Sequence, residues 1–158
     1  MDKEPIKESL KNISLRKATQ KDVDILITLE KSVDGVKTYS AMTESEEMLE
    51  ELKKDEIFII EQDGEAVGSV MYEMKSPEHA YISGLVIDPR FQGRGLGKEA
   101  MTMAMKELSH CERVDLVTHP ENARAIKLYE SLGFVIESRK ENYFGDGEPR
   151  VVMALEKK

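Results

Sequence analysis

The feature that most constrains the fold is a glycine-rich stretch, DPRFQGRGLGKEA, at residues 88–100. It follows an apolar segment typical of a buried strand, 79–88, and precedes a segment with the pattern of a helix, 98–110. The stretch carries three glycines at alternate positions: Gly93, Gly95 and Gly97. A helix N-terminus presents unpaired backbone N–H groups to anions, and glycines let those groups approach an oxyanion closely. The stretch therefore predicts a site for a phosphate or pyrophosphate at a strand-to-helix junction.

Other phosphate-binding loops fit this stretch less well. The dinucleotide fingerprint spaces its glycines as G-x-G-x-x-G, whereas the spacing here is G-x-G-x-G. A Walker A loop needs a serine or threonine after its Gly-Lys pair, but Glu99 follows Lys98. Arg94 and Lys98 add positive charge, which favours an anion. A glycine-rich loop without a ligand remains the structural alternative.

Composition and charge argue against several classes of partner. The 158 residues include 23 Lys and Arg and 31 Asp and Glu, and this net charge of −8 argues against nucleic acid. The single cysteine, Cys111, rules out an intramolecular disulfide, and the three histidines lie too far apart to predict a metal site. No apolar run approaches the roughly 20 residues that span a bilayer, and the N-terminal residues lack a signal-peptide pattern. We therefore expect a cytoplasmic protein without a membrane partner, and a homodimer is left open.

The hydrophobic periodicity predicts one mixed α/β (α+β) domain at 13–158, after a flexible, charged leader at 1–12. Strands are expected at 13–19, 56–62, 66–75, 79–88, 113–119, 135–144 and 149–157. Helices are expected at 20–32, 43–55, 98–110 and 120–132. Thr43 and Glu46 have the spacing of a capping box for the second helix. Gly133 is placed to end the last helix in a left-handed conformation.

Two sequence motifs resemble those of the GNAT superfamily of N-acetyltransferases. The segment LVIDPRFQGRGLGKEAM resembles its motif A, Q/R-x-x-G-x-G/A, through Gln92, Gly95 and Gly97. The segment ENARAIKLYESLGF resembles motif B, in which Asn122 is followed seven residues later by Tyr129. The C-terminal segment ENYF, an acidic turn and VVMALEK are similar to the hairpin of the ribosomal-protein N-terminal-alanine acetyltransferases. The resemblance implies a central mixed, mostly antiparallel sheet that is splayed between its fourth and fifth strands.

The resemblance also implies acetyl-CoA as the acetyl donor. The residues expected around its pyrophosphate are Gln92, Gly93, Arg94, Gly95, Leu96, Gly97 and Lys98. The residues whose backbone is expected to pair with its pantetheine arm are Leu85, Val86 and Ile87. The amide of Val86 or Ile87 would stabilise the oxyanion of the reaction. Asn122 matches the coenzyme-contacting asparagine of the family, and its other role, as a helix N-cap, is compatible with this one.

Tyr129 matches the general acid of the family, which lies beside the coenzyme and protonates the departing sulfur. Its alternative role is core packing, because it belongs to the apolar face of its predicted helix. The ribosomal-protein subgroup places a glutamate as the base five residues before the motif-B asparagine. That position is occupied here by Val117, which cannot accept a proton.

Two residues are therefore candidates for the general base. Tyr81 matches a tyrosine that some eukaryotic N-terminal acetyltransferases use as a base. His119 lies two residues beyond Val117 on the same face of its strand, and its ordinary pKa suits a base near neutral pH. Both also have purely structural interpretations, as a strand aromatic and as a strand-end residue. A water relay and Glu73 are further alternatives, whereas Cys111 has no evident histidine partner for an acyl-cysteine route.

The expected acceptor is a primary amine, and the resemblance favours the N-terminal α-amine of a protein or peptide held near Tyr143. A small cationic amine such as a polyamine, or a lysine, is the alternative, and it would suit the acidic net charge. A non-catalytic protein that only binds acetyl-CoA is a third interpretation. The acceptor groove is expected between the helices at 20–32 and 43–55 and the hairpin at 143–150.

Overall fold

The computed structural model describes residues 12–36 and 38–157, so the leader expected at 1–12 lies, except for Asn12, outside the described residues. The strands are β1 (Ile13–Lys17), β2 (Glu56–Gln62), β3 (Glu65–Ser76), β4 (His79–Ile87), β5 (Arg113–Thr118), β6 (Val135–Lys140) and β7 (Arg150–Glu156). The helices are α1 (Val23–Lys31), α2 (Ser45–Lys54), α3 (Leu96–Glu107) and α4 (Ala123–Ser131). Short 3-10 turns precede α1, at Gln20–Asp22, and follow β4, at Pro89–Phe91.

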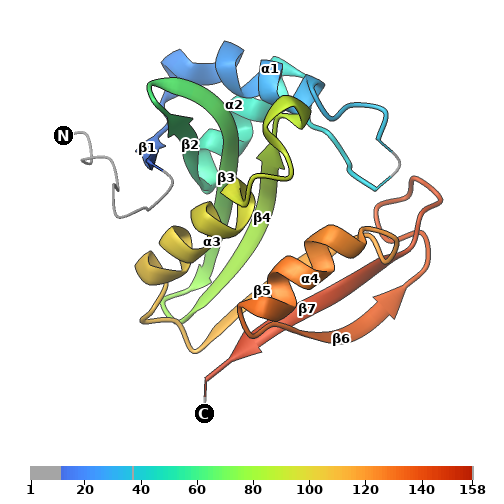
Figure 1. Cartoon of the computed structure of the whole chain (residues 1–158). Coiled ribbons are helices and arrows are strands. Elements are labelled where there is room, and N and C mark those ends of the chain that lie inside the picture. The colour runs from blue at the N-terminus through green and yellow to red at the C-terminus, as the bar shows by residue number, and fades with distance from the viewer. Residues whose placement is uncertain (1–11, 37, 158) are drawn as a thin grey trace.

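The strands form one sheet in the order β1-β2-β3-β4-β5-β7-β6 (Figure 1). Neighbouring strands are antiparallel except for β4 and β5, which are parallel. A parallel pair needs a crossover connection, and α3 supplies it. The mixed, mostly antiparallel sheet expected from the resemblance is therefore confirmed.

The sheet opens along the β4–β5 pair. The two strands are in register from His79 opposite Arg113 to Ile82 opposite Leu116, and the pairing stops there. Beyond this point β4 remains paired with β3, and β5 with β7. The two halves of the sheet then diverge, as Figure 1 shows. The splay predicted between the fourth and fifth strands is confirmed.

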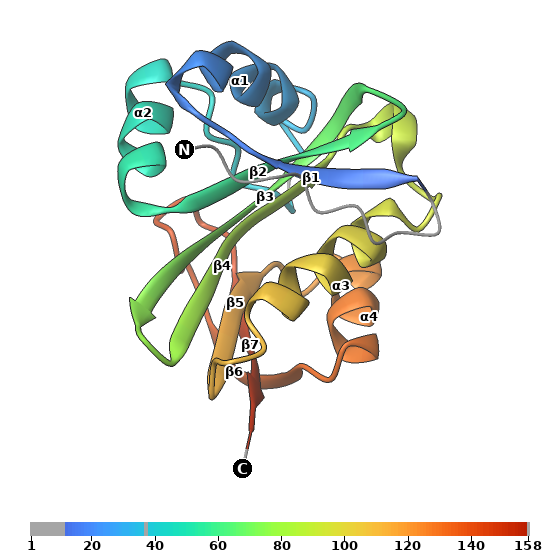
Figure 2. The same ribbon diagram turned by 90° about the vertical axis from the view of Figure 1, so that its left-hand side faces the viewer.

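Helices cover both faces of the sheet, with α1 and α2 on one face and α3 and α4 on the other (Figure 2). The α3 face holds the larger apolar cluster, to which Leu96, Met101, Met103 and Tyr129 belong. The opposite face holds a smaller cluster that includes Leu26 and Met48. The methionines of α3 thus pack in the core. Among the described residues, no helix is long and apolar enough to cross a membrane.

The capping box predicted for the second helix is wrong. The residue that precedes α2 is Glu44, and its side chain makes no capping hydrogen bond. A capping box does form one helix earlier, where Thr19 and Asp22 exchange side-chain-to-backbone hydrogen bonds around the first 3-10 turn. The spacing in the sequence is the same at both places, so the spacing alone does not determine where a capping box forms.

Other predicted ends also differ from the structure; the helix expected at 98–110, for example, is α3 at Leu96–Glu107. The strand expected at 135–144 ends at Lys140, and the following loop extends to Pro149. The helix expected at 120–132 begins at Ala123, because Asn122 acts as its N-cap and accepts a hydrogen bond from the Ala125 amide at 3.1 Å. Its predicted left-handed end is confirmed, since Gly133 has a φ of 101°.

Candidate active site

A cavity of about 1100 Å³ lies along the separated ends of β4 and β5. Its walls come from the loop after α1, from β4, from the glycine stretch and the first turn of α3, and from α4. The predicted site residues that line it are Tyr81, Leu85, Val86, Ile87, Gln92, Gly93, Gly95, Leu96, Gly97, Lys98, His119, Asn122 and Tyr129. Arg94 is the predicted residue outside this lining. The fold thus gathers residues from both motifs around one space.

The glycine stretch turns into α3 through two left-handed residues. Gly93 has a φ of 79° and Gly95, the N-cap of α3, has a φ of 78°, a conformation that strongly favours glycine. No side chain in the described part of the chain caps this helix start. The amides of the first turn, which have no partner within a helix, therefore remain available on residues that line the cavity. The positive end of the helix dipole adds to their attraction for an anion.

Gly97 and Gln92 hold the glycine stretch against its neighbours. A Cβ atom at Gly97 would lie 3.3 Å from Leu128 Cδ1, so glycine at this position allows α3 to approach α4 closely. Gln92 donates a hydrogen bond from Nε2 to the Ile87 carbonyl at 2.9 Å, and its Oε1 accepts one from Arg124 at 3.5 Å. This side chain ties the stretch to the end of β4 and to α4.

The positive charge at the cavity differs from the prediction. Arg94 packs its guanidinium against the Phe91 ring, 5.3 Å from the centroid, instead of lining the cavity. Lys98 does line it, together with Arg124 and Lys127 of α4. The sequence analysis missed these two residues. Their spacing within motif B, three residues apart and therefore on one helix face, was the available signal.

The end of β4 presents backbone to the cavity. Leu85, Val86 and Ile87 line it, and all three lie beyond the last residue that pairs with β5. The Val86 side chain packs in a small cluster with Leu29 and Val33 of the α1 region. Because the β4–β5 pairing stops at Ile82, this edge of β4 has no strand partner among the described residues and can pair with an extended ligand.

Tyr129 belongs to the core and to the cavity at once. It is 7 % exposed, its ring lies 6.0 Å from that of Phe134, and it lines the cavity from α4. Burial raises the pKa of Tyr129 to about 12, because a phenolate would lose its hydration. The phenol therefore stays protonated at every physiological pH, as a proton donor must. Both predicted roles of this residue are compatible with its position.

Tyr39, in the loop after α1, is a cavity residue that the sequence analysis missed. Its hydroxyl donates a hydrogen bond to Glu30 Oε2 at 3.3 Å, and Glu30 Oε1 accepts one from the Met42 amide at 2.7 Å. Glu30 is 1 % exposed, and burial raises the pKa of its carboxyl. An acidic residue on the apolar face of α1 was the available sign that this helix holds a buried polar contact.

Tyr81 lines the part of the cavity that also contains Glu51 and Glu73. Burial, with nearby Tyr143 and acidic groups, raises the pKa of Tyr81 to about 12. The Lys75 ammonium lies 5.5 Å from the centre of its ring. A phenol with this pKa is almost entirely protonated near neutral pH, so little of it is available as a phenolate base.

His119 is completely buried and already hydrogen-bonded at both ring nitrogens. Its Nδ1 accepts a hydrogen bond from the Glu121 amide at 3.0 Å, and its Nε2 lies 2.7 Å from Glu148 Oε1. Because Nδ1 accepts, Nε2 carries the proton and donates it to Glu148. The imidazole therefore joins the end of β5 to the loop between β6 and β7.

Comparison with known families adds to this geometry. The profile described as "Acetyltransferase (GNAT) family" matches residues 26–134, which covers more than half of the chain. The chain belongs to the GNAT family. The resemblance of its two motifs to this family is thereby confirmed.

GNAT proteins with two kinds of acceptor in their names are similar in sequence. The chain is 33% identical to the N-alpha-acetyltransferase MAK3 of Arabidopsis thaliana over 95 residues, covering 57% of this chain and 50% of the relative. It is 35% identical to the spermine/spermidine N(1)-acetyltransferase of Bacillus subtilis over 83 residues, covering 46% and 54% respectively. The chain spans about half the length of the curated relatives it matches.

Solved structures of acetyltransferases share the fold. The ribosomal L7/L12 alpha-N-protein acetyltransferase RimL, solved with coenzyme A, superposes with a TM-score of 0.81 at 18% identity over 97% of this chain and 98% of that one. The ribosomal-protein-S18-alanine N-acetyltransferase of Escherichia coli superposes with a TM-score of 0.78 at 21% identity over 91% and 93%. At these identities the likeness concerns the fold.

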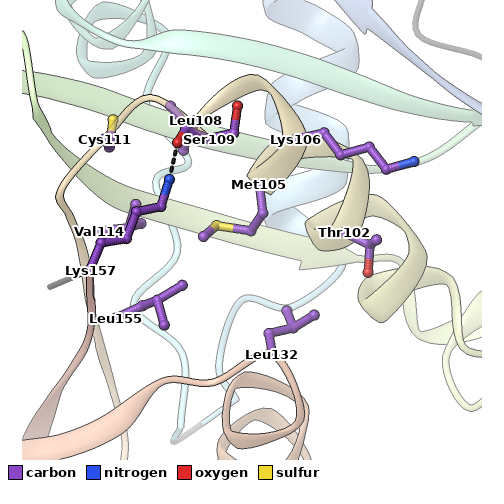
Figure 3. Close-up of a pocket in the computed structure, with 10 residues that line it drawn as sticks. All are labelled: Thr102, Met105, Lys106, Leu108, Ser109, Cys111, Val114, Leu132, Leu155 and Lys157. Carbon is purple, nitrogen blue, oxygen red and sulfur yellow. Dashed lines mark hydrogen bonds between the residues drawn. The ribbon is translucent and has the colours of Figure 1, made fainter.

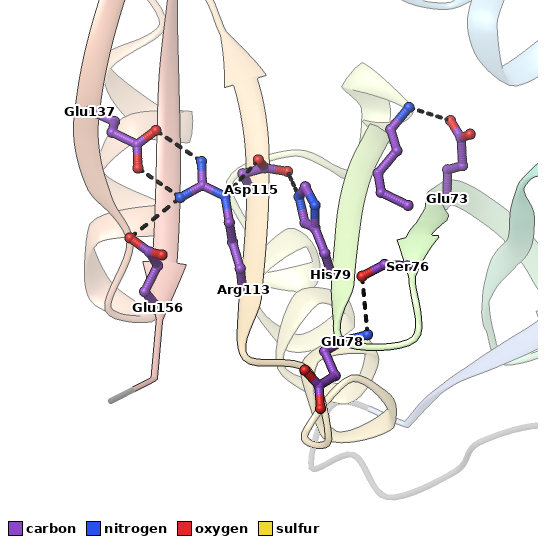
Figure 4. A network of polar contacts seen from close by, with 9 residues as sticks. Glu73, Ser76, Glu78, His79, Arg113, Asp115, Glu137 and Glu156 are labelled. Atoms are coloured by element: carbon purple, nitrogen blue, oxygen red, sulfur yellow. Dashed lines mark hydrogen bonds and ion pairs between the residues drawn. The ribbon is translucent and has the colours of Figure 1, made fainter.

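The closed end of the β4–β5 pair is held by charged side chains (Figure 4). His79 Nε2 of β4 lies 3.0 Å from Asp115 Oδ1 of β5, whose other oxygen accepts from Arg113 at 3.0 Å. Arg113 also binds both carboxylate oxygens of Glu137 on β6, at 2.8 and 2.9 Å. This pairing lowers the pKa of Glu137. The network links β4 to β6 across the sheet, opposite the end where the strands part.

A second, smaller cavity of about 320 Å³ lies between the C-terminal part of α3 and the paired strands β5 and β7 (Figure 3). Cys111 lines it, and burial raises the pKa of its thiol. His110 Nε2 lies 3.7 Å from its sulfur, a neighbour that the sequence analysis did not anticipate. Cys111 does not line the larger cavity. Among the described residues, no group of His, Cys, Asp and Glu side chains could hold a metal ion.

Proposed function

We propose that this GNAT protein transfers the acetyl group of acetyl-CoA to a primary amine, the N-terminal α-amine of a protein or peptide. One observation carries the proposal. The cavity at the β4–β5 splay joins an uncapped, glycine-rich helix start, an unpaired strand edge and a buried tyrosine hydroxyl. These three features suit a pyrophosphate, an extended amide-containing arm and a leaving group that needs a proton.

The coenzyme would lie along the cavity in one direction. Its pyrophosphate fits the amides between Gly93 and Lys98, with the cationic side chains of Arg124 and Lys127 close by. Its pantetheine amides fit the free edge of β4 at Leu85–Ile87. Acetyl-CoA supplies an activated acyl group, and the amide of Val86 or Ile87 at the end of β4 would stabilise the oxyanion that forms when an amine attacks it.

Tyr129 is proposed as the proton donor to the departing sulfur. Its raised pKa keeps the hydroxyl protonated, and Tyr129 lines the same cavity as the glycine stretch. The hydroxyl would donate a hydrogen bond to sulfur and transfer its proton as the C–S bond breaks. Asn122 would contact the coenzyme while it caps α4.

An α-amine is the preferred acceptor, and a polyamine is the second candidate. Relatives named as N-alpha-acetyltransferases support the first, and the Tyr143–Phe144 pair on the loop beside β7 offers exposed aromatic surface for a peptide. Two acidic residues of the cavity, Glu51 and Glu73, favour a cation. Both acids are already paired with lysines, at 3.3 and 3.1 Å, so we place the polyamine second.

We also propose a domain organisation, a cellular location and an assembly for this protein. A single domain at 13–158 and a cytoplasmic location rest on the sequence pattern and the lone cysteine. A homodimer is supported by the edge strand β6, where Val135 is 62% exposed and Ile136 49%. Neither nucleic acid nor a membrane is proposed as a partner.

Calorimetric titration with acetyl-CoA tests the coenzyme site. Gly95→Asp places a negative side chain on a left-handed residue at the start of α3, so acetyl-CoA affinity should fall by at least about 10-fold, or 1.4 kcal/mol. Gly64→Asp is the matched control, because Gly64 has a similar φ of 83° but lies in the β2–β3 turn. Equal affinity of a folded Gly95→Asp variant and the wild type would refute the site.

A further inference from the structure

Neither residue that the sequence suggests as a base is well prepared to accept a proton. The phenol of Tyr81 has a raised pKa, and both ring nitrogens of His119 are already hydrogen-bonded. A buried carboxylate beside the cavity, that of Asp55, is better prepared to accept a proton. Asp55, between α2 and β2, is 4 % exposed, and its Oδ1 has no hydrogen-bond donor among the described residues.

Asp55 reaches the cavity through Ser83. The Ser83 hydroxyl donates a hydrogen bond to Asp55 Oδ2, and Ser83 lines the cavity from β4. Ser83 is the extra residue of a β-bulge, since the β3–β4 register passes from Met71 opposite Gly84 to Tyr72 opposite Ile82. Bulges redirect side chains near active sites. This one lies immediately after Ile82, the last residue of β4 that pairs with β5.

Charged and titratable groups face Asp55 from three elements. They are Glu51 and Lys54 of α2, Glu73 of β3 and Tyr81 of β4. Glu51 lies within hydrogen-bonding reach of Asp55, so a proton between the two carboxyls would satisfy the unpaired oxygen. Burial first, and then Glu51, raise the pKa of Asp55 to about 7. A carboxyl in this state accepts and releases a proton near neutral pH.

We propose that Asp55, acting through the Ser83 hydroxyl, is the proton acceptor for the amine substrate. The inference rests on the proposed acetyl transfer and names the base of that same site. Asp55 does not itself touch the amine, and Ser83 is the group that does. The pair lies at the point where the strands part, beside the β4 segment proposed for the pantetheine arm.

In the proposed reaction the nitrogen of the acceptor loses two protons, and the sulfur of the coenzyme gains one. The ammonium form of the acceptor gives one proton to Ser83 Oγ while the Ser83 proton moves to Asp55. The neutral amine attacks the acetyl carbon, a C–N bond forms and the C–S bond breaks. Tyr129 gives its proton to sulfur and regains one from the nitrogen of the new amide. Asp55 then releases its proton to solvent, which leaves one H⁺ per turnover.

The pH dependence of kcat/KM tests the inference, measured with two acceptors of different basicity. The acceptors are a short peptide with a free N-terminus, whose amine titrates near 7.7–8.0, and spermidine, whose amines resemble the lysine value of about 10.4. If kcat/KM rises near pH 7 with every acceptor that the protein acetylates, the group that titrates there belongs to the protein and not to the acceptor. Asp55→Asn keeps the shape and removes the proton acceptor, so kcat/KM at pH 7.5 should fall by roughly 10² or more, and this common rise should vanish.

Three further variants separate a proton path from a structural effect. Ser83→Ala should reproduce the loss, and Ser83→Thr, which keeps a hydroxyl, should restore most of the activity and the rise near pH 7. Asp22→Asn replaces a buried carboxylate near β1, 7 % exposed, and should keep both. Acetyl-CoA binding, measured by calorimetry, should be unchanged in Asp55→Asn and in both Ser83 variants.

The measurements distinguish a failure of the proton path from a failure of the proposed acetyl transfer. If Asp55→Asn or Ser83→Ala retains the common rise near pH 7, the proton path is wrong and the proposed acetyl transfer stands. If the wild type binds acetyl-CoA but acetylates no amine, the proposed function itself fails. Carbon-13 NMR of the Asp55 carboxyl needs no turnover, and a pKa below about 5 there would also overturn the inference.

Discussion

Burial determines the chemistry of individual side chains around the cavity. Tyr129 and Tyr81 lose hydration and are kept as neutral phenols, with pKa values of about 12. The same loss of hydration raises the pKa of Asp55 to about 7, which makes this carboxyl a stronger base than an exposed one. One physical cause therefore prepares both the proton donor that we propose on α4 and the proton acceptor that we propose beside α2.

Tyr129→Phe should abolish most of the activity and leave the coenzyme bound. The change removes the hydroxyl and keeps the ring against Phe134, so turnover should fall by roughly 10²–10⁴. Calorimetry should give an acetyl-CoA affinity close to that of the wild type. Tyr72→Phe is the matched control, because Tyr72 is a buried tyrosine with a pKa of about 12 that lies outside the cavity lining. Full activity in Tyr129→Phe would assign this tyrosine to core packing alone.

Asp55→Asn should stabilise the protein most at alkaline pH. The folded-state pKa of Asp55, about 7, lies above its usual 3.8, so folding takes up a proton between these values and stability falls as pH rises through this window. The asparagine variant has no such cost. Its advantage in Tm should grow from about pH 4 to about pH 7 and then level off, at about 2–4 °C for each kcal/mol.

Asp88→Asn is the control of opposite sign for this measurement. The hydrogen bond from Arg90 lowers the pKa of Asp88, so its ionised form contributes stability above the ordinary aspartate pKa. That contribution disappears as pH falls through the lowered pKa. This variant should therefore have a lower Tm than the wild type at neutral pH and a similar Tm in strong acid. Equal pH profiles for the two variants would contradict at least one of the two assignments.

At the scale of elements, close backbone approaches decide where the strands lie. A Cβ atom at Gly68 of β3 would lie 2.2 Å from the Val86 carbonyl oxygen, a contact that no backbone tolerates. This glycine allows β3 to hold the part of β4 that borders the cavity. Gly97 likewise allows α3 and α4 to approach each other closely. Gln92 holds the glycine stretch to the end of β4 through its hydrogen bond to the Ile87 carbonyl.

Gly68→Ala should therefore lower both stability and coenzyme affinity. The added methyl group has to displace β4 at Val86, so Tm should fall and acetyl-CoA should bind less tightly in the fraction that stays folded. Gly84→Ala on the facing strand is the matched control, because its Cβ would meet Met71 at an ordinary 3.6 Å. A calorimetric comparison in which both variants melt alike would show that the approach at Gly68 is not limiting.

At the same scale, the sequence predicted the elements better than the contacts between them. The strand-to-helix junction, the cap at Asn122 and the helix end at Gly133 were predicted because each depends on neighbouring residues. The bulge at Ser83 and the contact with Asp55 were not, because both depend on which residues of distant segments face each other. No local pattern marks Asp55 as buried, since it follows a helix end rich in charge.

For the whole molecule, a sheet that is paired at one end and parted at the other explains the position of the site. The charged network from His79 to Glu137 holds the paired end, and the cavity occupies the parted end. The two motifs lie about 30 residues apart in the chain, on α3 and α4, and the fold brings both to one wall. The resemblance of the two motifs to those of the GNAT family predicted that both would line one site. Without the resemblance, the residues of the motifs predicted only a phosphate site.

The central claim is acetyl transfer to an N-terminal α-amine, and one measurement tests it most directly. Purified protein and acetyl-CoA are incubated with two peptides of the same lysine-containing sequence, one with a free N-terminus and one with a blocked N-terminus. Mass spectrometry then locates the acetyl group, and thiol release gives the rate. We predict a single acetyl group on the α-amine of the free peptide and none on the blocked peptide. Equal acetylation of the blocked peptide on lysine would contradict the α-amine assignment, and no acetylation of any amine despite coenzyme binding would contradict the claim that this protein is an acetyltransferase.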